Sequence, residues 1–212
     1  MFATLLDHVS VAGAVVTADA MHAQRAHAEY LVTQRGAHYL LTVKANQPGL
    51  HAQLAKLPWR QVPVAHSARE RGHGRAERRT MKVTAVAAGL AFPHAAQALR
   101  IIRRRRPLNS KKWSAETIYA ITSLTAIQAR PAELAAIIRG HWLIEDRLHW
   151  VRDVTYDEDR SQVRTANGPR VMASLRNLAI AILRLTGQTS IAAALRHHAR
   201  QPSRPLHTIM NC

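Results

Sequence analysis

Two acidic residues lie in settings where a carboxylate can bind a divalent metal ion. Asp19 follows residues 11–18, a short apolar and β-branched run of the kind found in a buried strand. Glu145 lies in the sequence HWLIED, directly after an apolar helical pattern, in a chain that has 30 Lys and Arg against 13 Asp and Glu. A strand-end aspartate and a helical glutamate can together hold two Mg²⁺ ions, which activate the attacking oxygen and stabilise the leaving oxygen. The pair therefore suits magnesium-dependent phosphoryl transfer.

Each of these residues also has a simpler explanation. On a helix, Glu145 shares a face with His141 and Trp142 at spacings of four and three, and with Arg152 at seven. The same pattern is typical of an amphipathic helix whose glutamate is ion-paired. With His149, four residues after Glu145, the face would also suit a transition metal. Asp19 taken alone is explained as the N-cap of the helical segment that follows.

The composition favours a folded protein that binds a polyanion. The formal charge is +17, which indicates nucleic acid as the partner, and the aromatic content of 5% argues against single-strand binding on stacked aromatic side chains. The single cysteine, Cys212, excludes an intramolecular disulfide framework and suits a reducing cytoplasm. No apolar stretch approaches the ~20 residues needed to span a bilayer, and the first twenty residues lack the positive region of a signal peptide. We therefore expect a cytoplasmic, nucleoid-associated protein without a membrane partner.

The elements that must position the two carboxylates begin with a strand–helix–strand unit. Residues 11–18 and 38–44 read as strands, and residues 22–35 between them have a helical pattern that Gly36 ends. Such a unit favours a parallel sheet covered by helices, with the site at the carboxyl ends of its strands. Asp19 and the group Lys44, Asn46 and Gln47 would both lie there. These three polar residues are candidates for contact with a DNA phosphate, and a solvated loop is the alternative.

The rest of the chain divides into a β-rich middle and a helical end. Residues 48–75 contain several prolines and glycines and are expected to be irregular. Three further strands are predicted at residues 81–87, 98–104 and 117–123. Helices are predicted at residues 131–152, with a break near Gly140, and at residues 169–185 and 190–200.

Two basic segments are further candidates for DNA contact. In GHGRAE, Gly72 and Gly74 permit a tight turn that would present His73 and Arg75, and a simple loop with an ion pair to Glu77 is the alternative.

The second basic segment is the run of four arginines at residues 103–106. If the run continues a strand, its side chains alternate between two faces, so that Arg103 and Arg105 would face a DNA backbone. A charged edge that discourages strand pairing is the competing explanation.

A cluster of acidic residues follows the predicted helix that carries Glu145. It is interpreted as the source of an additional metal ligand or, as the alternative, as a solvated turn: Asp153, Asp157, Glu158 and Asp159.

Several segments, in order, resemble the DDE transposases of bacterial insertion sequences, in the branch of the H-repeat-associated proteins. They are VVTADAMHAQ (15–24), YLLTVKANQP (39–48), GHGRAERR (72–79), IRGHWLIEDRLHWVRDVTYDEDRSQVR (138–164) and NGPRVMASLRNLAIAILR (167–184). The resemblance implies an α/β fold with a ribonuclease-H-like core, incomplete at the N-terminus, a β-rich insertion and a helical C-terminal end. The parts would be residues 1–50 with Asp19, the insertion at 51–128, and residues 129–212 with Glu145.

The resemblance also implies the site. Asp19 would be the second of three metal-binding carboxylates and Glu145 the third, holding Mg²⁺, or Mn²⁺ as an alternative ion. The wider superfamily shows a Tyr, an Arg, the catalytic Glu and a Lys at positions that fall here on Ile138, His141, Glu145 and Arg152. Only the Glu is retained, Arg152 keeps the positive charge, and the pair His141–Trp142 takes the place of the other two. His141, Trp142 and Arg152 are therefore expected near the DNA.

One departure concerns the first aspartate of the triad. The family carries it in an Asp-Gly-Lys motif well before the second, and no such motif occurs here, where eighteen residues precede Asp19. The chain thus looks like the C-terminal part of a transposase, with weak or absent strand transfer and an exposed sheet edge that lowers solubility. One hypothesis is an active transposase that takes its missing carboxylate from another chain, with a homodimer as one candidate assembly. The other is a non-catalytic remnant that binds double-stranded DNA, the transposon ends.

Overall fold

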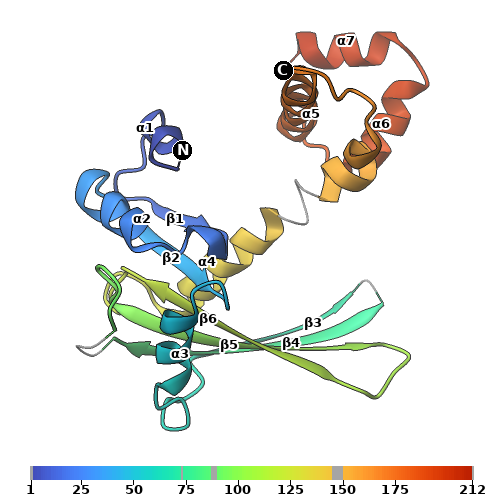
Figure 1. Ribbon diagram of the computed structural model, residues 1–212. Coiled ribbons are helices and arrows are strands. Elements are labelled where there is room, and N and C mark those ends of the chain that lie inside the picture. Colours follow the sequence, from blue (N-terminus) through green and yellow to red (C-terminus); the bar gives the residue numbers. More distant parts are fainter. Residues whose placement is uncertain (1, 73, 87–89, 145–149, 212) are drawn as a thin grey trace. The chain divides into compact units, whose positions relative to one another are not determined.

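The computed structural model describes residues 2–72, 74–86, 90–144 and 150–211 (Figure 1). The chain forms two compact units, Met1–His141 and Trp142–Cys212. The first unit contains a mixed β-sheet with helices, and the described part of the second is helical. The predicted α/β class with a helical C-terminal end is confirmed, and the predicted division into three parts stays a prediction.

The sheet has six strands in the order β1-β2-β6-β5-β4-β3. β1 pairs in parallel with β2, and every other neighbouring pair is antiparallel. The strands of residues 1–50 and those of residues 51–128 therefore belong to one hydrogen-bonded sheet. Their bounds are β1 Val15–Ala18, β2 His38–Val43, β3 His66–Gly72, β4 Arg75–Ala85, β5 Gln97–Pro107 and β6 Ser114–Thr122.

The predicted strand–helix–strand unit is present at the start of the sheet. The helical turns between β1 and β2 come in three pieces, η1 (Ala20–His22), α2 (Arg25–Glu29) and the π-helical η2 (Tyr30–Gln34). Gly36 follows with φ +57°, a conformation that favours glycine, and turns the chain into β2. β2 is buried from Tyr39 to Val43, as expected of an apolar strand that is covered on both faces.

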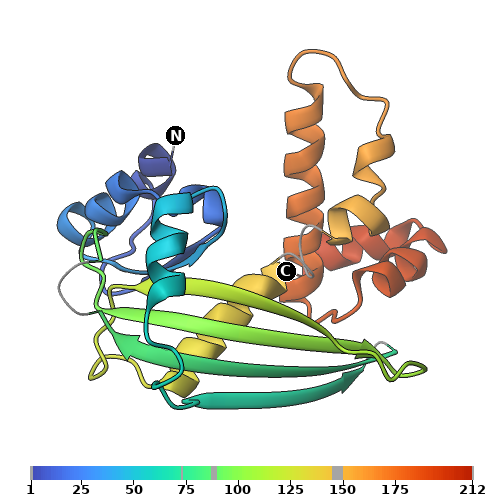
Figure 2. The same ribbon diagram turned by 60° about the horizontal axis from the view of Figure 1, so that its bottom comes forward.

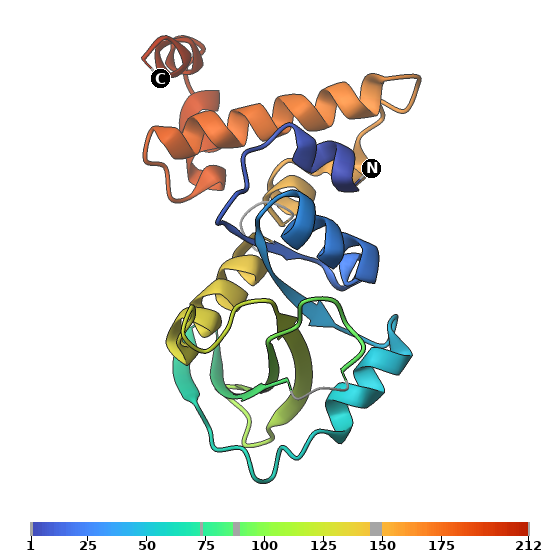
Figure 3. The ribbon, with the colours of Figure 1, turned by 90° about the vertical axis from the view of Figure 1, so that its left-hand side faces the viewer.

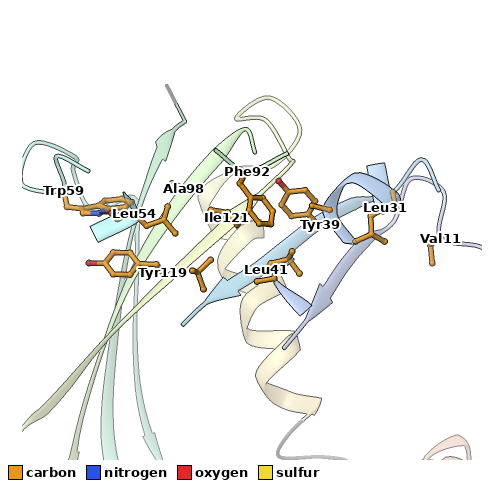
Figure 4. Close-up of a cluster of buried hydrophobic side chains, with 14 residues drawn as sticks. Val11, Leu31, Tyr39, Leu41, Leu54, Trp59, Phe92, Ala98, Tyr119 and Ile121 are labelled. Atoms are coloured by element: carbon orange, nitrogen blue, oxygen red, sulfur yellow. Dashed lines mark hydrogen bonds between the residues drawn. The ribbon is translucent and has the colours of Figure 1, made fainter. Parts of the chain in front are cut away.

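Helices cover both faces of the sheet. α3 (Pro48–Lys56) lies on one face and α4 (Pro131–Ile144) on the other (Figures 2 and 3). Leu54 of α3 is fully buried in a core with Tyr39, Leu41 and Ile121 of the central strands (Figure 4). On the opposite face, Arg139 of α4 forms an ion pair with Glu70 of β3. This core fixes the strand ends that carry Asp19 and Lys44.

Two predictions of local structure were wrong. Residues 48–75, expected to be irregular, contain α3 and β3. α3 forms despite Pro48 because the proline occupies the first helical turn, where it is tolerated. β3, with the sequence HSARERG, has little strand propensity of its own and is defined by its pairing with β4. α4 also runs through Gly140 without the predicted break.

The second unit contains three described helices, α5 (Gly168–Leu185), α6 (Ile191–Ala199) and α7 (Ser203–Met210). The short helices η4 (Val151–Thr155) and η5 (Glu158–Arg160) precede them. A small core joins η4, α5 and α6 through Val151, Ile180, Leu183, Ile191 and Ala194. α5 and α6 agree with the prediction, whereas α7 was not predicted. In the described part of the chain, every helix is too short or too polar to cross a bilayer.

Candidate functional site

Asp19 and Lys44 meet at the carboxyl ends of the parallel strands β1 and β2. Asp19 Oδ1 accepts a hydrogen bond from the backbone N–H of Ala20 at 2.6 Å and lies 3.8 Å from Lys44 Nζ. The two side chains are 59% and 63% exposed. The cap-like contact predicted as the alternative role of Asp19 is therefore present, on a carboxylate that solvent can still reach.

Asn46 holds the two strand ends together. Its Nδ2 donates to the carbonyl oxygen of Ala20 at 2.9 Å, which links the loop after β2 to the turn after β1. Gln47 is half-buried, and its backbone N–H donates to the carbonyl oxygen of Lys44 at 3.0 Å. Both residues thus shape the loop beside Asp19, and their contact with DNA stays a prediction.

The donor chemistry at Asp19 fits a divalent cation. Oδ1 accepts the hydrogen bond from Ala20, whereas Oδ2 accepts no hydrogen bond from the described residues, and a carboxylate oxygen is the ligand that Mg²⁺ prefers. Glu145 lies outside the described residues, so a cation shared with Asp19 stays a prediction. Over residues 2–72, 74–86, 90–144 and 150–211, no group of three His, Cys, Asp or Glu is arranged to hold a metal ion.

Of the other residues predicted around Glu145, His141, Trp142 and Arg152 are described, whereas His149 lies outside the described residues. His141, in α4, is half-buried, and its Nδ1 has no hydrogen-bond partner among the described residues. Trp142 is half-buried as well. Arg152, in η4, donates from Nε to Glu158 at 2.6 Å, and this hydrogen bond raises the pKa of Arg152. A phosphate would have to compete with Glu158 for this guanidinium.

Two carboxylates of the acidic cluster after Arg152, Glu158 and Asp157, form ion pairs. Glu158 contacts Arg152 and, at 3.2 Å, Arg176, and the hydrogen bond from Arg152 lowers the pKa of Glu158. Asp157 lies 3.6 Å from Arg160. These two carboxylates therefore have cationic partners of their own, which supports a structured turn.

Part of the predicted turn between β3 and β4 is described. Gly74 adopts φ +69°, and Arg75 is exposed beside it, whereas His73 lies outside the described residues. Glu77 forms ion pairs with three arginines other than Arg75: Arg79 at 2.5 Å, Arg103 at 2.7 Å and Arg105 at 3.7 Å.

Glu77 is the centre of a buried ion-pair network. Its side chain is 7% exposed. Desolvation by burial acts to raise the pKa of Glu77, but the hydrogen bond from Arg103 and the charges of Arg103, Arg79 and Arg105 together lower it. Arg105 also lies 3.7 Å from Glu116. The DNA contact predicted for Arg103 and Arg105 stays a prediction, and their carboxylate partners count against it.

Sequence reasoning missed the arginines on the opposite face of the same strands. Arg78 and Arg104 are exposed and directly opposite each other on β4 and β5. The alternation within residues 103–106 was a signal for them, but the choice between odd and even positions depends on where Glu77 lies in the sheet.

Comparison with known proteins identifies the family. The protein-family model described as the transposase DDE domain matches residues 1–182 of this chain. Three Escherichia coli relatives are similar: the "H repeat-associated putative transposase YhhI" of strain K12 (30% identity, 93% of this chain, 54% of the relative), the "Putative transposase YncI" of O157:H7 (31%, 85% and 48%) and the "Putative protein YbfL" of strain K12 (30%, 93% and 54%). The chain spans about half the length of these curated relatives. Because the family model matches residues 1–182, the chain belongs to the transposase DDE domain family.

Proposed function

We propose that this protein is a transposase that cuts and joins DNA by metal-assisted phosphoryl transfer at a ribonuclease-H-like site. Membership of the DDE family implies DNA binding and the use of a divalent metal ion. The observation that carries the proposal is the exposed carboxylate of Asp19 at the end of β1, with Lys44 Nζ at 3.8 Å. Acidic oxygen beside a cation suits a site that must bind both a metal ion and a phosphate.

In this proposal each residue has a distinct task. Asp19, through its Oδ2, and Glu145 would hold Mg²⁺ or Mn²⁺, which when bound activates the attacking oxygen and stabilises the leaving oxygen. Lys44 would neutralise a phosphate oxygen next to Asp19, while Asn46 keeps the two loops in register. The attacking groups would be water in cleavage and a 3′-hydroxyl in strand transfer. The DNA would be the transposon ends, which would place the protein on the bacterial nucleoid.

A second candidate function is DNA binding without catalysis. The sequence has no Asp-Gly-Lys motif for the first carboxylate of the triad, and two carboxylates bind metal less well than three. We therefore propose that the chain by itself has weak or absent strand-transfer activity. Another chain could supply the first carboxylate.

A plasmid-nicking assay tests the proposed chemistry. Supercoiled DNA is incubated with the full chain in Mg²⁺ or Mn²⁺, and with the variants Asp19→Asn and Glu145→Gln. Glu116→Gln serves as the control, because Glu116 is an exposed carboxylate of β6 that is 61% accessible. Nicking that needs Asp19 and Glu145 but not Glu116 supports the transposase.

The other outcomes separate the two candidates. Nicking that survives both substitutions contradicts the assigned roles of Asp19 and Glu145. Absence of nicking in every protein, with DNA binding retained, supports the non-catalytic candidate.

A further inference from the structure

The long strands β3, β4 and β5 carry a set of arginines on one face, which we call the arginine face: Arg69, Arg71, Arg78, Arg104 and Arg106. We infer that the arginine face binds the phosphate backbone of double-stranded DNA. The inference rests on the proposed function in one respect, namely that the polyanion is DNA. It assigns a surface and residues different from those predicted in the arginine run, Arg103 and Arg105.

The strand register determines which face of the sheet each charged side chain occupies. Glu70 is opposite Glu77, and Glu77 is opposite Arg105. Glu116 is opposite Arg103. Residues that are directly opposite in a sheet point to the same face. All three acidic residues of β3 to β6 therefore point to the face that α4 covers, where they form ion pairs with Arg79, Arg103, Arg105 and Arg139.

Every charged residue that the same strands place on the opposite face is a cation. Arg69, Arg78 and Arg104 are directly opposite one another across three strands, and all three are exposed. In the next row, exposed Arg71 and half-buried Arg106 flank Ala76. β3 to β6 are described throughout, and none of their carboxylates points to this face. These strands continue well beyond α3, which lies on the same side (Figure 2).

Folding by itself does not explain this arrangement. Neighbouring strands lie about 4.8 Å apart, and like charges directly opposite each other destabilise a sheet. The row Arg69–Arg78–Arg104 contains two such pairs. A bound polyphosphate would remove the repulsion and release the counterions condensed on the DNA. The stability cost of the arginine row is thus offset in a complex with a polyanion.

Trp113 holds part of the arginine face in place. The guanidinium carbons of Arg78 and Arg106 lie 5.2 and 5.3 Å from the centre of its ring, within the range of cation–π contacts. Arg106 also donates from Nη1 to the carbonyl oxygen of Ser110 at 2.7 Å. Two arginines that are already oriented lose less side-chain entropy when they bind a phosphate.

The same contacts favour a duplex over a single strand. Trp113 is half-buried and occupied by its two arginines, so its ring is not free to stack on a base. The cations are spread over three strands, which suits the regularly spaced phosphates of a duplex. We therefore expect backbone contacts that depend on salt and little on sequence.

The test compares two variants that lose the same charge. In the first, Arg69, Arg71, Arg78 and Arg104 are changed to glutamine, which keeps the aliphatic stem and removes the charge. The matched control changes four exposed cations outside the arginine face to glutamine: Lys56, Arg60, Arg170 and Arg200. Binding of a fluorescent 30-base-pair duplex to the full chain is measured by anisotropy in EDTA at several salt concentrations, together with a duplex RNA and a single-stranded DNA.

The inference predicts a clear difference between the two variants. The arginine-face variant should bind duplex DNA at least about tenfold more weakly near 0.15 M salt. The slope of log K against log salt should fall by about 0.9 for each phosphate that is no longer neutralised, which is up to about 3.6 for four phosphates. The affinity and the slope of the control variant should both fall clearly less. Circular dichroism and thermal melting check folding, and Arg78→Gln with Arg104→Gln serves as a milder variant.

Several results would overturn the inference. They are equal losses of affinity in the two variants, a wild-type chain that does not bind the duplex, and tighter binding of RNA or of single-stranded DNA. Because the measurement is made in EDTA, it is independent of catalysis. Absence of nicking with salt-dependent duplex binding through the arginine face would defeat the proposed catalysis and support this inference.

Discussion

At the scale of single residues, Glu77 is a buried carboxylate whose ion pairs carry an energetic consequence. It is shared by three guanidinium groups, which are themselves 18–35% exposed. Removing one side of a buried ion pair leaves uncompensated charge, and this costs more than the pair itself contributes. Glu77 therefore binds β4 to β5 and also keeps Arg103 and Arg105 occupied.

We predict that Glu77→Gln lowers the free energy of unfolding by about 3 kcal/mol at pH 7, the lower end of the range for buried pairs because the arginines remain partly hydrated. Urea denaturation measures this loss. Glu116→Gln, which removes a carboxylate that is 61% exposed on the same face, should cost below about 1 kcal/mol. Equal midpoints for the two variants would show that Glu77 is not the centre of the network.

The lowered pKa of Glu77 also predicts a pH dependence. A carboxylate whose pKa is lower in the folded state stabilises the protein at pH values above its unfolded pKa, here about 4.5. That stabilisation is lost as the pH falls through the folded pKa. The free energy of unfolding of the wild type should therefore decline below about pH 4.5, and the decline should be shallower in Glu77→Gln. Parallel pH profiles for the two proteins would contradict the assignment.

At the scale of elements, two glycines have opposite roles. Gly36 ends the helical segment before β2 with φ +57°, and its carbonyl oxygen accepts a hydrogen bond from the backbone N–H of Gly13 at 2.9 Å. Any other L-residue is strained there, so Gly36→Ala should lower the free energy of unfolding by about 1 kcal/mol. An unchanged urea midpoint would indicate that the turn relaxes without cost.

Gly140 lies inside α4, with open space where a Cβ would be placed. Alanine removes the entropic cost of glycine in a helix, so Gly140→Ala should raise the free energy of unfolding by about 0.5–1 kcal/mol. The same urea titration measures it. A destabilised Gly140→Ala would contradict this expectation, because it would mean that the added Cβ is not accommodated.

At the scale of the whole molecule, the two units have cores of different size. The core of Met1–His141 joins β2, β5 and β6 to α2, η2 and α3, whereas the described core of Trp142–Cys212 contains five buried residues. Large apolar side chains of α5 and α7 are exposed: Val171, Leu175, Leu178, Leu185, Leu206, Ile209 and Met210. Local stability follows the buried apolar surface, so the second unit is expected to open more readily.

Hydrogen exchange measured by mass spectrometry tests this difference. Peptides from α5, α6 and α7 should exchange at least about tenfold faster than peptides from β2 and β6 under native conditions. Equal protection in the two sets would show that the second unit has stability that its own core does not explain.

The sequence by itself determined the local features that depend on neighbouring residues. Three such features each specify an element through their own conformational preferences. They are the β-branched run before Asp19, the glycine after the first helical segment and the proline at the start of α5. The same reasoning placed Asp19 and Lys44 after two successive strands. The resemblance of several motifs to the DDE transposases was enough to predict the family.

Tertiary structure decided what depends on pairing between distant segments. β3 is a strand only because it pairs with β4. Within residues 103–106, Arg103 and Arg105 are neutralised because Glu77 and Glu116 lie on the same face of the sheet. A shift of one residue in register would exchange the two faces, and the sequence of one strand does not contain that information. The physical reason is that the partner on the neighbouring strand decides whether a charged side chain in a sheet is neutralised, and the fold decides which residue that partner is.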